Sequence, residues 1–199
     1  VPFKSAFDIE RAHDEIFNFI AAMVKAGIIP LSCGGDHSVS LPILRAVATQ
    51  PLAFIHIDAH TDTWDSFQGS KFNHGAPFRR AHEEGLIDAT KTVQIGIRGA
   101  QNVSEGWDYS VNAGMRVMFV EEVQKRGVDE IIEEVRFIVG DTPVYLSFDI
   151  DSLDPAFAPG TGTPEIAGMT TREMVNVLRG LSGLNLVSAD VVEVSPAYD

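Results

Sequence analysis

Six short apolar runs, separated by segments long enough to form helices, constrain the fold of this sequence more than any other feature. Each run is largely apolar rather than alternating with polar residues, as expected for strands buried on both faces. Strands of this kind that take turns with helices predict an α/β protein with a mostly parallel sheet covered on both faces. The runs are Ile28–Cys33, Leu52–Ile57, Thr92–Ile97, Arg116–Val120, Val144–Ile150 and Leu186–Val194.

Capping signals predict where helices begin and end between these runs. Helical periodicity covers residues 128–139 and 171–181, and Thr170 with Glu173 forms a capping box before the second segment. No repeat, charge block or linker interrupts the chain, so we expect a single domain over residues 1–199. Ser5 with Asp8 predicts the start of the first helix, and Gly27 predicts its end. Ser38 or Ser40 is the expected cap of the second helix, with Pro42 in its first turn.

The composition excludes several classes of function. Of the 199 residues, 45% are hydrophobic and 22% are charged, which is typical of globular rather than disordered chains. No apolar run approaches the ~18–20 residues of a membrane span. The 15 Lys and Arg against 28 Asp and Glu give a net charge of −13, which argues against nucleic acid or an anionic membrane as partner and favours cations. The single Cys33 excludes an internal disulfide, and the first residue, Val1, leaves targeting open.

Histidines and carboxylates follow four of the six runs. Because ligands bind beyond the carboxyl ends of parallel strands, we expect these side chains to meet at one edge of the sheet. Asp58, His60 and Asp62 alternate, as do Asp149 and Asp151, so each set faces one side of an extended chain. The segments concerned are Gly34–Ser38, Asp58–Asp62, Asp149–Pro155 and Val192–Pro196.

These carboxylates predict a metal site. Five carboxylates that converge without Lys or Arg would repel one another and raise their pKa values, and divalent cations remove that repulsion. Ligation by oxygen and imidazole without thiolate indicates Mn²⁺, with Mg²⁺, Co²⁺ or Fe²⁺ as alternatives, and the number of carboxylates suits two ions better than one. Each motif alone is also typical of a helix cap or a tight turn, so the prediction depends on their combination.

In their order along the chain, the motifs GGDHS, DAHTD, HGAPF, SFDIDSLDPAFAPGTGTPE and VVEVSP resemble the ureohydrolase family, which includes arginase, agmatinase and guanidinobutyrase. The resemblance covers nearly the whole chain and implies the family's three-layer fold, a mostly parallel sheet between helices. It also implies a homo-oligomer, a trimer or hexamer, located in the cytoplasm or, with a leader, in mitochondria. Since family members extend further at both ends, we expect residues 1–199 to be one catalytic domain that lacks its N- and C-terminal parts.

The resemblance further implies two Mn²⁺ ions per chain. Asp58 and Asp149 would bind both ions and so bridge them. The ligands of one ion would be His37, Asp58, Asp62 and Asp149, and those of the other Asp58, His60, Asp149 and Asp151.

The implied reaction is the hydrolysis of a guanidino compound to urea and an amine. Glu193 would hold the substrate guanidinium in a fork geometry, and His74 would transfer a proton to the departing amine. Asp62 would orient the nucleophile. The two metal ions would lower the pKa of the attacking water so that hydroxide is available near neutral pH.

The residues before His74 indicate which guanidino compound is cleaved. Phe72 stands two positions before His74, where arginases have asparagine, which argues against arginine. We expect agmatine, a small cationic guanidino compound, to be cleaved to putrescine and urea. The alternative is guanidinobutyrate or another guanidino acid, with Arg98 as the partner of its carboxylate.

Two other functions fit the sequence less well. A non-catalytic relative of the family would be expected to have lost ligands, and all six are present. A two-metal phosphoesterase would need Lys or Arg near the metals to bind phosphate, and none lies in the motifs.

The remaining histidines and the cysteine are expected to be structural. His13 and His82 are expected on the surfaces of amphipathic helices. His56 is expected to pack within the sheet, out of phase with the Asp58 set, and Cys33 to be a small core residue.

Overall fold

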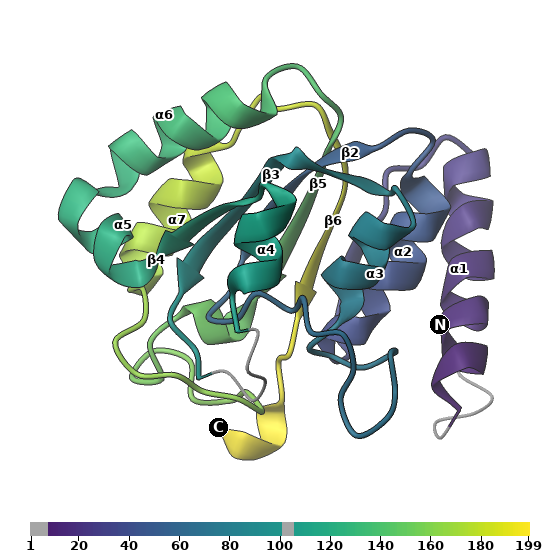
Figure 1. The fold of residues 1–199 in the computed structure, drawn as a ribbon, viewed down its shortest axis with the longest axis horizontal. Helices are drawn as coiled ribbons and strands as arrows, with labels where there is room; N and C mark the ends of the chain where they lie inside the picture. The colour runs from purple at the N-terminus through teal and green to yellow at the C-terminus, as the bar shows by residue number, and fades with distance from the viewer. Residues whose placement is uncertain (1–7, 101–105) are drawn as a thin grey trace.

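The computed structural model describes residues 8–100 and 106–199. Its six strands form one sheet in the order β1-β6-β5-β2-β3-β4, and every neighbouring pair is parallel (Figure 1). The expected α/β fold with a parallel sheet is confirmed. The strands are β1 (Leu31–Cys33), β2 (Leu52–Ile57), β3 (Ile87–Ile97), β4 (Arg116–Phe119), β5 (Val144–Asp149) and β6 (Leu186–Val192).

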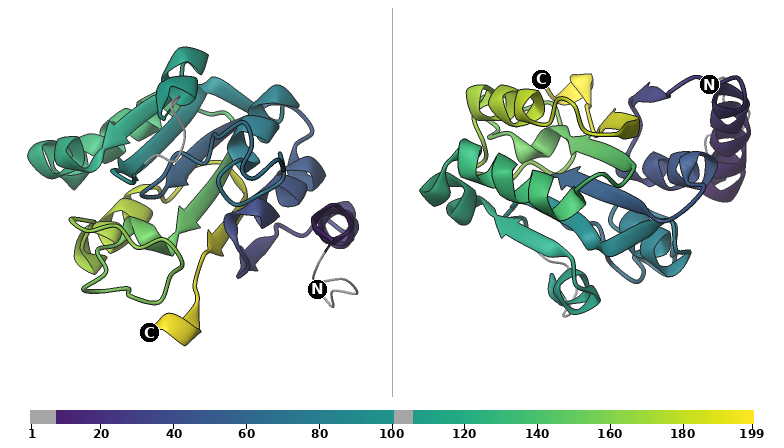
Figure 2. Two further views of the ribbon diagram at one scale, coloured as in Figure 1. Left: turned by 60° about the horizontal axis from the view of Figure 1, so that its bottom comes forward. Right: turned by 90° about the horizontal axis from the view of Figure 1, so that it is seen from above.

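Helices cover both faces of the sheet and complete three layers (Figure 2). One face carries α1 (Ile9–Lys25), α2 (Ser40–Val47), α3 (Pro77–Glu83) and α4 (Asp108–Ala113). The other face carries α5 (Val120–Arg126), α6 (Val128–Val139) and α7 (Thr171–Gly180). Short 3₁₀ turns at His37–Val39, Ile150–Ser152 and Pro196–Tyr198 follow β1, β5 and β6.

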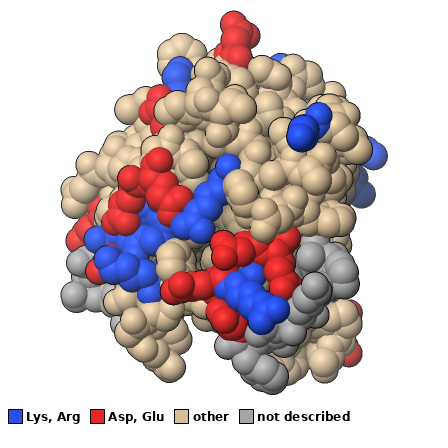
Figure 3. All heavy atoms as spheres, turned by 90° about the vertical axis from the view of Figure 1, so that its right-hand side faces the viewer, with Lys and Arg blue, Asp and Glu red and all other residues tan. Residues whose placement is uncertain are grey.

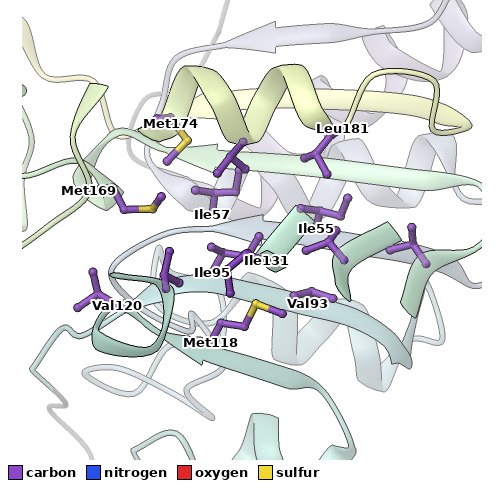
Figure 4. Close-up of a cluster of buried hydrophobic side chains, with 14 of the residues drawn as sticks. Ile55, Ile57, Val93, Ile95, Met118, Val120, Ile131, Met169, Met174 and Leu181 are labelled. Carbon is purple, nitrogen blue, oxygen red and sulfur yellow. The ribbon is translucent and has the colours of Figure 1, made fainter. Parts of the chain in front are cut away.

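Two apolar cores separate the layers, and the alternation of residues along β2 assigns its side chains to one core or the other. Ile55 and Ile57 face α5, α6 and α7, where they pack with residues such as Ile95 (Figure 4). Phe54 faces the opposite side and belongs to the core that includes Phe78 of α3. The central strands are therefore buried on both faces, as their apolar sequences predict.

Several element boundaries differ from the sequence expectations. The first strand begins only at Leu31; Ile28 and Ile29 precede it and are exposed. Asp8 itself caps α1 by accepting a hydrogen bond from the Arg11 amide, whereas Ser5 lies outside the described residues. The capping box of Thr170 and Glu173 before α7 is confirmed.

The cap expected before α2 is wrong. Asp36 caps the preceding 3₁₀ turn by accepting a hydrogen bond from the Ser38 amide, and α2 itself has no side-chain cap. The Ser40 hydroxyl instead donates to Asp190, 2.6 Å away in the core. A sequence pattern cannot distinguish these roles because each places a hydroxyl near a helix start.

Three side chains outside the motifs also lie elsewhere than expected. His13 is buried rather than exposed, and Cys33 is exposed on the edge strand rather than buried in the core. His82 is partly buried, and its Nδ1 lies 2.9 Å from the Tyr109 hydroxyl. Amphipathic spacing assigns a face of a helix, but it does not show which other segments cover that face.

The outer face formed by α1 and its neighbours carries both signs of charge. Acidic and basic side chains lie beside one another there (Figure 3), for example Arg11 with Glu15 at 3.4 Å and Arg45 with Glu84 at 2.6 Å. Within residues 8–100 and 106–199, none of the helices combines the length and apolar character needed to cross a membrane.

Candidate metal centre

The carboxyl ends of β2 and β5 lie side by side in the middle of the sheet. The strand register pairs Ile57 with Phe148, so the residues that follow, Asp58 and Asp149, lie at the same edge. From this edge the chain continues from β2 towards β3 and from β5 towards β6, in opposite directions across the sheet. Such a switch point opens the crevice in which α/β proteins bind ligands.

His37 brings three carboxylates together at this crevice. Its Nδ1 lies 2.9 Å from Asp62 Oδ2, 3.1 Å from Asp58 Oδ2 and 3.2 Å from Asp149 Oδ2. Among the described residues, none makes a hydrogen bond of acceptable geometry to Nδ1, although the ring is fully buried. Four potential ligand atoms therefore converge in a buried space, which is an arrangement suited to a cation.

The other nitrogen of this ring has a fixed partner. His37 Nε2 lies 2.7 Å from Ser147 Oγ, which lies 2.6 Å from Asp190 Oδ1. The Ser147 hydroxyl donates its one hydrogen to Asp190, so its oxygen accepts from the Nε2–H of His37. The nitrogen left for a cation is Nδ1. Hydrogen-bonded partners of this kind orient the histidines of metal sites.

His60 forms the second part of the cluster. Its Nδ1 lies 3.0 Å from Asp151 Oδ2 and 3.5 Å from Asp58 Oδ1. Burial lowers the pKa of His60, but hydrogen bonds to Asp151 and Asp58 outweigh it and raise the pKa to about 12. Positive charge at Nδ1, whether a proton or a metal ion, is what these carboxylates stabilise.

The carboxylates have strongly shifted pKa values. Burial, together with the charges of Asp58 and Asp151, raises the pKa of Asp149 well above its usual value. Burial also raises the pKa of Asp58, but His56, His37 and His60 outweigh this and lower it well below its usual value. The cluster thus holds more negative charge than its own side chains neutralise.

This donor set fits divalent metal ions. Two groups of side chains have ligand atoms within 4.8 Å of one another, and Asp58 belongs to both. Imidazole nitrogen and carboxylate oxygen, without sulfur in these groups, are ligands for Mn²⁺ and related ions. The groups are His37, His56, Asp58 and Asp62, and Asp58, His60 and Asp151. The structure thus brings five of the six predicted ligands into these two groups, and the first group also contains His56. Asp149 lies beside the first group, with its Oδ2 3.2 Å from His37 Nδ1.

Glu193 lies beside His37 on a strained part of the backbone. Its Oε1 accepts a hydrogen bond of 2.7 Å from the His37 amide, and burial raises the pKa of its carboxyl to about 7. Glu193 has a φ of 61° and Asp62 a φ of 51°, in the left-handed region that residues other than glycine rarely adopt. Strain of this kind persists where the surrounding structure fixes it, and it concentrates at functional sites.

A cavity of about 200 Å³ lies at the cluster, and both carboxylates and aromatic rings line it. His74 lies on its wall, with its ring centroid 6.3 Å from that of Trp64 and 6.1 Å from that of Phe67. A side chain on Gly75 would come within 2.5 Å of the Trp64 ring, so this position needs glycine. The sequence reasoning missed Trp64; its place in the polar loop before His74 was the available signal.

Two residues that the sequence singles out for the far end of the substrate, Arg98 and Phe72, are not among the described residues that line this cavity. The Arg98 guanidinium is already used: it donates to the backbone carbonyls of Asp151 at 2.8 Å and Glu165 at 2.7 Å, so it cannot serve as the partner of a substrate carboxylate. Phe72 does not line the cavity; it packs beside His13, with ring centroids 5.8 Å apart. Phe72 is partly buried and packs against the core that includes Ile16 and Ile20 of α1.

A parallel α/β sheet with a buried histidine and carboxylate cluster at its switch point is typical of proteins that bind a ligand or a metal ion in that crevice. Comparison with known sequences identifies the family within this class. A sequence profile of the arginase family matches residues 1–199, and the chain belongs to that family. The resemblance drawn from the motifs is thereby confirmed.

Curated relatives lie on the agmatinase and guanidinobutyrase side of the family. The chain is 51% identical over 179 residues to a mitochondrial agmatinase of Gallus gallus, covering 89% of this chain and 53% of that protein. It is 52% identical over 186 residues to a guanidinopropionase of Pseudomonas aeruginosa, covering 92% of this chain and 58% of that protein. The chain therefore spans little more than half the length of these relatives.

Solved structures share the fold. The structure of proclavaminate amidino hydrolase from Streptomyces clavuligerus matches with a TM-score of 0.94 at 44% identity, covering 98% of this chain and 65% of that one. An arginase structure from Bacillus cereus matches with a TM-score of 0.87 at 28% identity, covering 96% of this chain and 72% of that one. The arginase-like fold expected from the sequence is confirmed.

Proposed function

We propose that this chain carries the catalytic centre of a ureohydrolase, which cleaves a guanidino compound to urea and an amine. The observation that carries the proposal is the convergence of Asp58, Asp62 and Asp149 around His37 Nδ1, next to a cavity that Glu193 also lines. A guanidinium carbon is a poor electrophile, so its hydrolysis needs an activated nucleophile and a bound, oriented substrate.

The centre would hold two Mn²⁺ ions. Bound ions of this kind supply positive charge that acidifies water and polarises the substrate. His37, Asp58, Asp62 and Asp149 would bind one ion, and Asp58, His60, Asp149 and Asp151 the other. The support is the overlap of the two ligand groups at Asp58 and the 3.2 Å approach of Asp149 to His37.

The side chains around the cavity would carry out the remaining steps. Glu193, ionised, pairs with the substrate guanidinium and holds its carbon over the cluster. Asp62 orients the attacking water, whose oxygen forms the new bond to that carbon. The proton that the water releases on attack passes to His74, which delivers it to the amine nitrogen as the bond from carbon to that nitrogen breaks, and the products are urea and an amine.

Agmatine is the proposed substrate, with putrescine as the amine product. None of the described residues that line the cavity is Lys or Arg, whereas Glu165 and the rings of Trp64 and Phe67 lie on its wall. A carboxylate at the far end of a guanidino acid would therefore be buried there without a partner, at a cost of at least about 1–3 kcal/mol. Because one relative is a guanidinopropionase, guanidinobutyrate and other guanidino acids are the second candidate substrates.

The test is urea release by the full chain, measured with added Mn²⁺ for agmatine, guanidinobutyrate, guanidinopropionate and arginine. We expect urea from agmatine at the highest kcat/KM. A preference for a guanidino acid would replace the substrate and keep the reaction. No urea from any of these compounds, in protein that binds Mn²⁺, would favour a non-catalytic relative, and hydrolysis of a phosphate ester instead would indicate a phosphoesterase.

We also propose that residues 1–199 form one catalytic domain, the central part of a longer chain that assembles into a trimer or hexamer. The support is the single sheet into which all six strands pair and the partial coverage of the longer relatives. Light scattering after size-exclusion chromatography of the full chain tests the assembly. A monomer at micromolar concentration would contradict it.

A further inference from the structure

His56 lies inside the sheet, two residues before Asp58, and the function proposed above gives it no task. Its side chain is fully buried, and three rings surround it at centroid distances of 4.4, 5.1 and 5.4 Å: Phe78, His37 and Phe54. A close-packed interior holds such a ring in one orientation. The expectation that His56 lies out of phase with Asp58 is wrong: residues two apart in a strand share a face, and the ring points towards the cluster.

Gln94 of β3 determines which nitrogen of this ring carries the proton. Gln94 Nε2 lies 2.8 Å from the Thr61 carbonyl oxygen and 3.0 Å from His56 Nδ1. A carbonyl oxygen only accepts, so the group that faces it is the NH₂ end of the amide. The second hydrogen of this NH₂ is donated to Nδ1, and the ring proton is therefore on Nε2.

The Nε2–H of His56 is aimed at Asp58. His56 Nε2 lies 2.8 Å from Asp58 Oδ2, and Asp58 Oδ1 accepts a hydrogen bond of 2.6 Å from the His60 amide. Each oxygen of Asp58 thus has one fixed donor. Asp58 is the carboxylate that belongs to both groups of potential ligands, so its orientation affects the whole cluster.

We propose that His56 is a positioning residue for Asp58 and that Gln94 fixes the tautomer in which His56 donates. The inference rests on the proposed function, because it takes Asp58 as a metal ligand. Removal of a hydrogen-bonded partner behind a metal ligand typically lowers metal affinity about 10–100-fold. The Gln94 amide also ties the segment between His60 and Asp62 to β3, through the Thr61 carbonyl.

The test is the Mn²⁺ affinity of the full chain, measured by calorimetric titration for the unaltered protein and for two variants. His56→Leu removes the donor while keeping a buried apolar side chain, and we expect binding about 10–100-fold weaker. His56→Gln keeps an N–H near the position of Nε2, and we expect it to restore most of the affinity. A role of His56 in packing alone would not give this rescue.

Two further variants complete the series. Gln94→Leu leaves His56 in place but removes the donor to Nδ1, so we expect a loss of Mn²⁺ affinity smaller than that of His56→Leu. His13→Leu is the matched control, because His13 is also buried but neither of its ring nitrogens has a hydrogen-bond partner among the described residues. Its Mn²⁺ affinity is expected to equal that of the unaltered protein.

Equal Mn²⁺ affinity of the unaltered protein and a folded His56→Leu variant would overturn the inference and leave the proposed function intact. Failure of the unaltered protein to bind Mn²⁺ would overturn the proposed function instead. If His56→Leu does not fold, as judged by circular dichroism, the Mn²⁺ affinities of Gln94→Leu and His56→Gln decide. Weaker binding by Gln94→Leu together with near-normal binding by His56→Gln supports the inference. Unchanged binding by Gln94→Leu, or weak binding by a folded His56→Gln, overturns it.

Discussion

The two histidines of the candidate metal centre are held in different ways. His37 is fully buried, and its outer nitrogen bonds to Ser147, which bonds to Asp190 in the core. The side chain of His60 is 16% exposed, lines the cavity, and has its outer nitrogen 3.5 Å from Glu165 on the cavity wall. The first half of the centre is therefore fixed by the core, and the second half by loops.

The loops that hold His60 meet at Arg98 and Gly99. The amides of both residues donate to the Ala59 carbonyl, at 2.9 and 2.8 Å, and a side chain on Gly99 would overlap the His60 ring. The Arg98 guanidinium holds the carbonyls of Asp151 and Glu165 on the other side. Changes in the His37 half should thus affect folding stability and metal binding together, whereas changes in the His60 half should affect the centre alone.

The largest effect is expected where the two halves meet. Asp58→Ala removes a carboxylate that belongs to both groups, so we expect loss of urea release and a loss of bound metal beyond the ~10–100-fold typical of an outer partner. Metal content by mass spectrometry and urea assays measure this. The exposed Asp141 offers a control, Asp141→Ala, which should change neither. Full metal content in Asp58→Ala would show that the two halves of the centre do not depend on a shared Asp58.

His74→Asn tests whether the open side of the centre can lose chemistry without losing metal. We expect turnover to fall by about 10²–10⁴, because the leaving amine loses its proton donor, with metal content unchanged. Steady-state kinetics and metal analysis of one preparation decide this. If metal is lost as well, His74 has a structural role beside Trp64 and Phe67 rather than a role in proton transfer.

Ser147→Ala and Glu165→Gln compare the outer partners directly. Ser147→Ala leaves the Nε2–H of His37 and one oxygen of Asp190 unpaired in the core, so we expect a loss of ~1–3 kcal/mol in the free energy of unfolding and about 10–100-fold weaker metal binding. Glu165→Gln keeps an oxygen acceptor facing His60, and we expect it to change neither quantity as much. Denaturant unfolding of metal-free protein and metal titration measure both. Equal effects of the two variants on stability and on metal affinity would show that the core does not fix His37 more firmly than the loops fix His60.

The pH dependence of substrate binding is the smallest expected effect. Glu193 pairs with a guanidinium only when ionised, and burial raises the pKa of its carboxyl to about 7. With a pKa of about 7, the ionised fraction rises from about a tenth at pH 6 to about half at pH 7, so KM for agmatine should fall about fivefold over that unit and level off by about pH 8. In Glu193→Gln, KM should be high and flat. A flat profile in the unaltered enzyme would show that the metal ions keep Glu193 ionised throughout.

Sequence periodicity predicted the elements whose apolar residues are buried in a regular pattern. The helix at Val128–Val139 and the strand Leu52–Ile57 have the expected bounds: Ile131, Val135 and Val139 are buried at helical spacing, and every residue of the strand is buried. Ile28 and Ile29 were assigned to a strand on their apolar character, yet they lie outside β1 and are exposed. Apolar character indicates burial only where another segment is present to cover it.

The candidate ligands were predictable because each follows a recognisable strand, and a parallel sheet brings its carboxyl ends together. The residues that form hydrogen bonds to these histidines were not predictable. Ser147 and Gln94 read as ordinary strand residues, since their bonds to His37 and His56 depend on register between strands far apart in sequence. Arg98 was considered as the carboxylate partner only for the alternative substrate, a guanidino acid, and no local pattern reveals that backbone carbonyls already use its guanidinium.

The hydrogen bond from the His37 amide to Glu193 joins residues 156 positions apart, and this distance orders events during synthesis on the ribosome. At ~5–20 residues per second, Glu193 is made about 8–30 seconds after His37. A nascent chain that presents His37, Asp58 and His60 early in that interval still lacks Asp149 and Asp151, and the Glu193 partner of the His37 amide comes last. Because a metal binds tightly only to a formed site, tight binding at the candidate centre would wait until β5 and β6 have been made and paired.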